Sequence, residues 1–334
     1  MDICISSQGT ENFLLRNDTG KNGGKIKFTD VTKEAGVGLP IKSFPVAFLD
    51  YNNDGWEDLT IMTYDAEHCD YDNAAEYFNK PVKGEYSILY RNNGDGTFTD
   101  VTKEMHMDVA MTVMGLSFGD IDNDGWLDIY SGTGTPNYTS LVPKRMFRNN
   151  EGKGYQDVTH SGGFGHLQKG HGIGFGDVDN DGDQDVYEDM GGGYEGDGFQ
   201  GAFYENPGNT GNNWVSIQLV GVKANRCAMG SKVKITVENA DKTTRDIYLV
   251  VSNGGSFGVN SNRLETGIGK AVAIKQVEIT WQGPNTKQII TNVPINAFVK
   301  ITEGQEAVKV EAFKAFKFTA MPMDTTMMHH NHPM

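Results

Sequence analysis

Three nine-residue stretches with one pattern determine the expected fold: DYNNDGWED at 50–58, DIDNDGWLD at 120–128 and DVDNDGDQD at 177–185. Acidic or amide side chains stand at positions 1, 3, 5 and 9 of each stretch, and glycine stands at position 6. Self-similarity of this kind is the sequence signature of a repeat architecture. The stretches therefore predict one structural unit that is built several times along the chain.

Two further markers accompany these acidic stretches. The first is an Arg-Asn pair at 16–17, 91–92 and 148–149, with a weaker Glu-Asn at 205–206. The second is Phe-Thr-Asp-Val-Thr at 28–32 and 98–102, which becomes Tyr-Gln-Asp-Val-Thr at 155–159. The marker asparagines are 57 residues apart in the later units and 75 apart in the first. Most of the additional residues fall in 63–87, where we expect a short helix or a lid loop.

The segments around each acidic stretch have the character of short strands joined by turns. Ser87–Arg91, Gly115–Gly119 and Leu127–Ser131 are examples, and the 42 glycines support a structure rich in tight turns. Four short strands per unit are typical of a β-propeller blade. Only three complete units and the start of a fourth are present, whereas closed propellers need about four or more blades. We therefore expect an all-β chain with a partial or truncated propeller that lacks its N-terminal part, or else an open or oligomeric arc.

The spacing within each acidic stretch suits a hard cation. Oxygens at positions 1, 3 and 5 converge if the backbone curls, and glycine at position 6 makes the sharp turn without a Cβ penalty. A carbonyl at position 7 and a carboxylate at position 9 complete a set of about six or seven oxygen ligands, which suits Ca²⁺. About three Ca²⁺ sites are therefore predicted. The twelve candidate metal ligands are Asp50, Asn52, Asp54, Asp58, Asp120, Asp122, Asp124, Asp128, Asp177, Asp179, Asp181 and Asp185.

The acidic stretches allow two other interpretations. Asn-Asp-Gly is also a common hairpin turn, so a single copy would say little. The third copy matches an EF-hand loop because Glu188 stands at position 12, where the first two copies have Ile61 and Ser131. No amphipathic helix flanks that copy, so we reject the EF-hand. Glu188 is then either a coincidence or a supplementary ligand.

Charge and composition exclude several classes of protein. The 334 residues carry a net charge of −15, which argues against nucleic-acid binding, and no apolar run is long enough for a transmembrane segment. The acidity is concentrated in residues 1–212, with 15 basic and 35 acidic side chains, while 213–320 have 14 basic and 8 acidic ones. The three widely spaced cysteines define neither a disulfide framework nor a zinc site. No signal peptide is visible at the N-terminus.

The repeats resemble FG-GAP/VCBS repeats, the propeller blades also found in integrin α-chains. Their Phe-Gly pair stands at 118–119 and 175–176 and is degraded to Phe48-Leu49 in the first copy. The C-terminal part is similar to the ASPIC/UnbV domain. The matching stretches are Asn213-Trp214, NRCAMGSKV at 225–233, Gly267-Ile268-Gly269 and VEITWQG at 277–283. At the last of these the family usually has Trp-Pro-Ser-Gly, from which Trp281-Gln282-Gly283 departs.

Together these resemblances divide the chain into three parts. We expect a repeat propeller region at 1–212, an ASPIC/UnbV domain at 213–303 and a C-terminal strand with a Met/His-rich tail at 304–334. Alternating apolar residues at 214–220, 232–237 and 277–281 also predict that the second part is a small β-sandwich.

The pairing of repeats with this C-terminal domain is similar to cartilage acidic protein and its bacterial homologues. That resemblance implies an extracellular or cell-envelope protein with Ca²⁺-dependent structural or adhesive binding, an unidentified protein or glycan ligand, and no established enzymatic activity. The alternative is a Ca²⁺-dependent polysaccharide-processing enzyme, although His166, His171 and the other histidines form no recognisable catalytic set. A separate, weaker hypothesis is copper binding by the tail, through its methionines and His329, His330 and His332.

Overall fold

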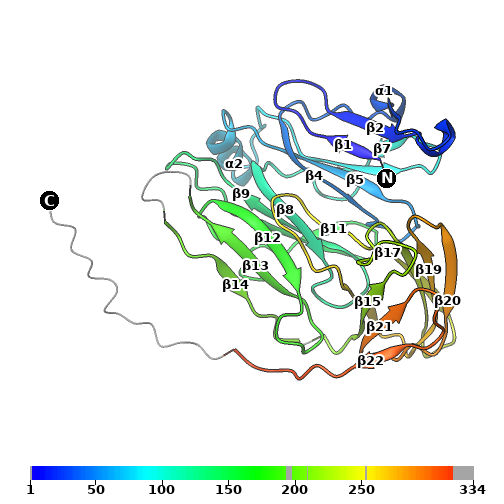
Figure 1. The fold of residues 1–334 in the computed structure, drawn as a ribbon. Helices are drawn as coiled ribbons and strands as arrows, with labels where there is room; N and C mark the ends of the chain where they lie inside the picture. The colour runs from blue at the N-terminus through cyan, green and yellow to red at the C-terminus, as the bar shows by residue number, and fades with distance from the viewer. Residues whose placement is uncertain (1, 193–197, 209, 253, 319–334) are drawn as a thin grey trace, which may run out of the picture.

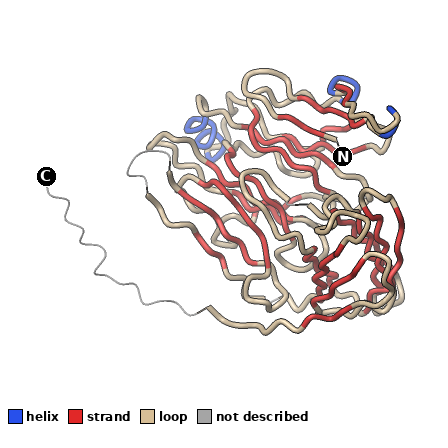
Figure 2. The backbone as a smooth tube through the Cα atoms, in the orientation of Figure 1, coloured by secondary structure: helices blue, strands red, loops and turns tan. Residues whose placement is uncertain are grey.

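The computed structural model describes residues 2–192, 198–208, 210–252 and 254–318. As predicted, their regular secondary structure is almost entirely β, with loops and turns between the strands (Figure 2). The helices among them are the 3-10 helix η1 (Gly20–Asn22) and the α-helices α1 (Thr32–Ala35) and α2 (Cys69–Tyr77). None of the described helices is long and apolar enough to cross a bilayer. Helix α2 confirms the short helix expected within 63–87.

Four antiparallel sheets are formed by the repeat region, and each corresponds to one repeat. The first sheet contains β1 (Ile3–Ile5), β2 (Phe13–Asn17) and β3 (Phe28–Asp30). The second contains β4 (Ser43–Leu49), β5 (Asp58–Thr63), β6 (Ile88–Asn92) and β7 (Phe98–Asp100). The third contains β8 (Val113–Gly119), β9 (Asp128–Thr133), β10 (Arg145–Asn149) and β11 (Tyr155–Asp157). The fourth contains β12 (Gly170–Gly176), β13 (Asp185–Met190) and β14 (Ala202–Tyr204).

The number of strands per sheet differs from the expectation of four at both ends of the row. The fourth sheet ends at β14 because Pro207 and Gly208 follow the marker asparagine, and no Phe-Thr-Asp-Val-Thr segment follows to form an outer strand. Where that segment is present, its last threonine fixes the outer strand. Thr102 Oγ1, for example, accepts a hydrogen bond from Leu89 N at 3.0 Å and donates one to Asp100 Oδ1 at 2.7 Å.

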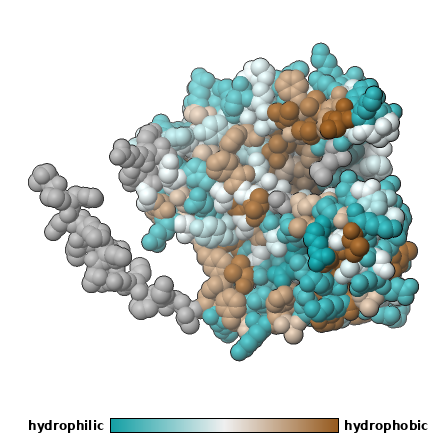
Figure 3. All heavy atoms as spheres, viewed as in Figure 1, coloured by the Kyte–Doolittle hydropathy of each residue, from teal (hydrophilic) through white to brown (hydrophobic). Residues whose placement is uncertain are grey.

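The four sheets lie side by side in a row and none of them closes into a barrel (Figure 1). Each neighbouring pair is joined by buried apolar side chains, such as Leu14 with Ile61 between the first two sheets and Tyr130 with Ile173 between the last two. At the N-terminal end of the row, Ile3 and Ile5 expose 42 % and 46 % of their surface, and Figure 3 shows apolar side chains gathered in that region. The outer face of the first sheet is therefore not fully covered within the described residues.

Two further four-stranded sheets form the C-terminal domain and face each other, as the predicted β-sandwich requires. One contains β18 (Leu264–Gly269), β15 (Asn213–Val220), β21 (Phe298–Thr302) and β22 (Lys309–Glu311). The other contains β17 (Thr244–Val250), β16 (Lys232–Glu238), β19 (Ala273–Trp281) and β20 (Thr286–Ile290). Their alternating inward residues form a single core that includes Ile217, Ile235 and Trp281. One pair, β15 with β21, is parallel.

Candidate functional site: three acidic loops beneath the C-terminal domain

Each acidic stretch connects the first two strands of its hairpin: 50–58 follows β4, 120–128 follows β8 and 177–185 follows β12. The residue at position 4 has a left-handed backbone in all three loops, with φ values of 52°, 55° and 61° for Asn53, Asn123 and Asn180. Asparagine tolerates this conformation better than most residues with a side chain. The glycine that follows two residues later also has a positive φ in every copy. The three loops therefore curl in the same way.

The carboxylate at position 1 holds this curl in place. In the second loop, Asp120 Oδ1 accepts a hydrogen bond from Asp124 N at 3.0 Å, and its Oδ2 accepts one from Gly125 N at 2.8 Å. Asp50 receives the equivalent bonds from positions 5 and 6 at 3.1 and 2.8 Å. Asp177 receives them at 3.1 and 3.1 Å. An acidic residue at position 1 is thus required by the backbone as well as by any cation.

Positions 1, 3 and 5 meet in the second and third loops. One carboxylate oxygen from each of Asp120, Asp122 and Asp124 lies within 4.8 Å of the other two, and the same holds for Asp177, Asp179 and Asp181. In the first loop, Asn52 Nδ2 instead donates to Asp54 Oδ2 at 2.9 Å. In the second and third loops, three carboxylate oxygens therefore converge, and carboxylate oxygens are ligands that Ca²⁺ prefers.

The environment of one carboxylate oxygen in the second loop indicates whether a cation fits there. Asp122 Oδ2 accepts a hydrogen bond from Arg148 Nε at 2.5 Å, but Asp122 Oδ1 is buried and has no hydrogen-bond partner. A buried polar atom without a partner is destabilising, and a buried charge even more so. Because this oxygen lies on a residue of the acidic group, a bound cation would satisfy it. The residues present fit a hard divalent ion.

The pKa values of the loop aspartates reflect chiefly their burial and, in smaller part, the neighbouring carboxylates. Burial, together with neighbouring carboxylates, raises the pKa of Asp50 to about 7, of Asp120 to about 8 and of Asp177 to about 7. Burial likewise raises the pKa of Asp124 to about 6. Ionised carboxylates are disfavoured in such surroundings unless a positive charge compensates them.

The aspartate at position 9 has a different environment from the other three. Asp128 Oδ1 accepts from Asn149 N at 2.7 Å and its Oδ2 accepts from Ile121 N at 2.9 Å. Asp58 and Asp185 make the same pair of bonds with their own loop and marker asparagine. Asp128 and Asp185 are not members of the oxygen groups formed by positions 1, 3 and 5. Position 9 therefore ties each loop to the next strand, a role that the sequence did not reveal.

Asparagine side chains also join successive loops. The marker Asn149 donates from Nδ2 to Tyr51 O of the preceding loop at 2.8 Å, and Asn206 donates to Ile121 O at 2.7 Å. At position 4, Asn53 Nδ2 donates to Gly125 O at 2.9 Å and Asn123 Nδ2 donates to Gly182 O at 3.0 Å. These bonds make a chain of three loops rather than three separate turns.

The C-terminal domain rests on this chain of loops. Gly267 N donates to Asp120 Oδ2 at 2.7 Å, and Arg245 Nη2 donates to Asp124 O at 2.5 Å. Tyr248 N donates to Asn53 Oδ1 at 3.0 Å in the first loop. In the third loop, a Cβ on Gly182 would lie 2.0 Å from Trp214 Cε2, so the indole occupies the space that a side chain would need. All three acidic loops therefore contact the second domain.

Family comparisons agree with this arrangement. Residues 82–131 match the family model described as an FG-GAP-like repeat, and residues 221–308 match the model described as ASPIC and UnbV. The chain combines an FG-GAP-like repeat with an ASPIC/UnbV domain. No curated protein matches the chain. FG-GAP repeats are typical of extracellular or envelope proteins, and both families are generally non-catalytic.

Glu188 has a structural environment rather than that of an EF-hand ligand. It lies within β13, fully buried, where Tyr130 Oη donates to its Oε2 at 3.0 Å and Lys144 Nζ lies 3.7 Å from its Oε1. Strands β12 and β13 flank the third loop, as the rejection of the EF-hand requires. Of the histidines near this loop, His166 Nδ1 accepts a hydrogen bond from Gln168 N, and His171 Nε2 contacts Gly191 O.

One acidic group in the structure was not anticipated. Asp65, Glu67 and His68 bring ligand atoms within 4.8 Å of one another. Lys42 Nζ already pairs with Asp65 at 2.8 Å and with Glu67 at 3.2 Å, and His68 Nδ1 pairs with Asp65 at 2.8 Å. Both carboxylates of this group therefore already have a cationic partner. The copper hypothesis concerns His329, His330 and His332, which lie outside the described residues.

Proposed function

We propose that this protein is a calcium-binding extracellular or cell-envelope module for adhesion or binding, with one Ca²⁺ in each acidic loop. The observation that carries the proposal is the buried, unpartnered Oδ1 of Asp122, which belongs to a group of carboxylates within 4.8 Å of one another. The other eleven candidate ligands keep their predicted roles in this proposal. The position-9 aspartates would contribute lone pairs not used by their backbone hydrogen bonds.

When bound, the cation supplies positive charge and fixed coordination. The contacts of the surrounding residues determine which parts of the fold this charge would stabilise. Asp120 accepts from its own loop and from Gly267 of the ASPIC/UnbV domain, so a cation that compensates its buried charge would favour the ionised carboxylate that accepts both hydrogen bonds. Arg245 Nη2 donates to the backbone of the same loop through Asp124 O. Calcium would therefore stabilise the position of the second domain as well as the curl of each loop.

The domain limits proposed from the sequence, 1–212, 213–303 and 304–334, are retained. The ligand that the module binds is proposed to be a protein or a glycan. The acidic repeats and the basic ASPIC/UnbV domain offer surfaces of opposite charge, which steer encounters and contribute specificity. A Ca²⁺-dependent polysaccharide-processing enzyme stays the alternative.

Equilibrium dialysis tests the cation sites. At millimolar free calcium, which saturates extracellular modules with Kd values of about 10⁻⁴–10⁻³ M, we expect about three ions per chain. Asp181→Ala should remove one of them, whereas Asp108→Ala should remove none, because Asp108 is exposed and lies outside the loops. Recovery of no bound calcium from the wild-type protein would overturn the proposal.

Incubation with a panel of acidic glycans separates the binding module from the enzyme. Retention of a glycan without new reducing ends supports the module. Bond cleavage that a chelator abolishes would instead establish the enzyme. The second domain is present in both arms, because the experiment uses the full chain.

A further inference from the structure

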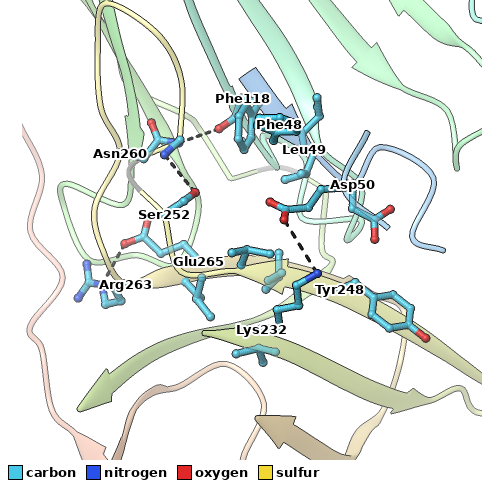
Figure 4. Close-up of a pocket in the computed structure, with 18 of the residues that line it drawn as sticks. Phe48, Leu49, Asp50, Phe118, Lys232, Tyr248, Ser252, Asn260, Arg263 and Glu265 are labelled. Atoms are coloured by element: carbon cyan, nitrogen blue, oxygen red, sulfur yellow. Dashed lines mark hydrogen bonds and ion pairs between the residues drawn. The ribbon is translucent and has the colours of Figure 1, made fainter. Parts of the chain in front are cut away.

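A cavity of about 240 Å³ lies between the repeat region and the ASPIC/UnbV domain. On one side it is lined by the ends of β4, β8 and β12, and on the other by β16, β17, β19 and residues 260–265. Figure 4 shows side chains from both walls, among them Phe118 and Arg263. The same hydrogen bonds that seat the second domain on the acidic loops hold these two walls together. The cavity is a feature of the interface that neither family match assigns.

The repeat side of the cavity is aromatic. Phe48, Phe118 and Phe175 all line it, and they occupy the same position in three successive repeats. Asn260 of the second domain fixes two of these strands, because its Oδ1 accepts from Phe175 N at 2.9 Å and its Nδ2 donates to Phe118 O at 2.7 Å. A cavity of about 150 Å³ lined by apolar side chains accommodates benzene. This one is larger, so it has room for a phenyl ring and a few further atoms.

The polar groups of the cavity differ in how firmly they are paired. Arg263 Nε lies 3.0 Å from Glu265 Oε1, and Lys234 Nζ lies 2.8 Å from Asp246 Oδ2. Lys232 and Glu57, in contrast, face each other across the domain boundary with 4.0 Å between Nζ and Oε2. Their side chains are 55 % and 35 % exposed, and among the described residues this long contact is the one ion pair of each. One cation and one anion at the cavity are therefore loosely engaged.

We propose that this cavity binds a free α-amino acid with an apolar side chain. The side chain would pack on the phenylalanines, the carboxylate would pair with Lys232 and the ammonium group with Glu57. Charge complementarity selects this class of ligand. A simple carboxylate would face the uncompensated charge of Glu57, and a simple amine would face that of Lys232, whereas a zwitterion satisfies both. The proposal goes beyond calcium binding and requires no bound cation, although Asp50 and Glu57 of the first acidic loop line the same cavity.

Calorimetric titration of the full chain at millimolar calcium tests the proposal with three probes of the same shape. These are L-phenylalanine, its N-acetyl derivative, which keeps only the carboxylate, and its amide, which keeps only the ammonium group. For a ligand of this size we expect a Kd on the order of 1 mM for L-phenylalanine. The other two probes should bind about tenfold more weakly, which is the loss of one charge-assisted contact.

Conservative variants assign the contacts. Lys232→Gln and Glu57→Gln should each raise the Kd for L-phenylalanine about tenfold. Lys275→Gln should leave this Kd unchanged, because Lys275 pairs with Glu238 and does not line the cavity. Glu57→Gln should also improve binding of the N-acetyl derivative, since it removes the repulsion, and a misfolded variant would not show this gain. Equal binding of all three probes, or no binding of L-phenylalanine by the wild-type protein, would overturn the proposal.

Discussion

Replacement of Asp120 by alanine perturbs both the second acidic loop and the domain interface. The carboxylate is fully buried and accepts three backbone hydrogen bonds, from Asp124 N, Gly125 N and Gly267 N. Removing it leaves three N–H groups without this partner, of which those of Gly125 and Gly267 are in buried bonds, and each buried group costs about 1–3 kcal/mol. Relief of the buried charge offsets part of this sum. We therefore expect a net loss of about 3 kcal/mol in the free energy of unfolding.

Thermal unfolding with and without calcium measures this loss. For a chain of 334 residues, about 3 kcal/mol corresponds to a fall in Tm of roughly 4 °C. Asp120→Asn keeps one acceptor oxygen and should fall between alanine and the wild type, while Asp108→Ala should leave Tm unchanged. In equilibrium dialysis, Asp120→Ala should also bind one ion fewer. The reasoning is refuted if Asp120→Ala melts like the wild type and still binds the full complement of calcium.

Three more predictions follow from the same loops. Because the folded pKa values of Asp50, Asp120 and Asp177, about 7, 8 and 7, exceed the unfolded value, their stabilisation is complete in acid and lost as pH rises through that range. Tm measured in chelator should therefore fall from about pH 5 to about pH 9, and calcium should flatten this slope; a rising Tm in chelator would contradict the assignment. Asn149→Ala removes the bond to Tyr51 O between loops and should cost about 1–2 kcal/mol in urea unfolding, whereas Asn73→Ala, at an exposed contact with Leu141 O, should cost less. Gly182→Ala places a Cβ against Trp214 and should increase proteolytic cleavage between the domains, with unchanged protection counting against the interface.

Much of the repeat region could be predicted from the sequence because its signals are local. A left-handed Asn-x-Gly turn, an acidic residue that accepts its own loop's N–H groups, and alternating strands all act within a few residues. The threefold recurrence of the pattern distinguishes it from a chance turn. The C-terminal sandwich could be predicted for the same reason. Alternation of apolar and polar residues along β15, β16 and β19 shows which face of each strand is buried in the core.

Contacts between distant segments could not be predicted in this way. The marker asparagines were visible as a pattern, but their hydrogen bonds to the preceding loop appear only when neighbouring sheets pack together. The number of strands in the first and last sheets likewise depended on which segments pair with a neighbouring strand. Position 9 stays a predicted ligand, but the sequence did not show that its carboxylate also ties the loop to the following strand through two backbone hydrogen bonds.

The sequence alone determined the repeats, their acidic loops and the oxygen-rich chemistry of those loops, because each depends on residues close together along the chain. Only the tertiary structure decided that the ASPIC/UnbV domain covers the loops, that Asp120 serves both domains, and that three repeat phenylalanines line one cavity. The physical reason is that these features require surfaces more than a hundred residues apart to become complementary, and such complementarity leaves no periodic trace in the sequence.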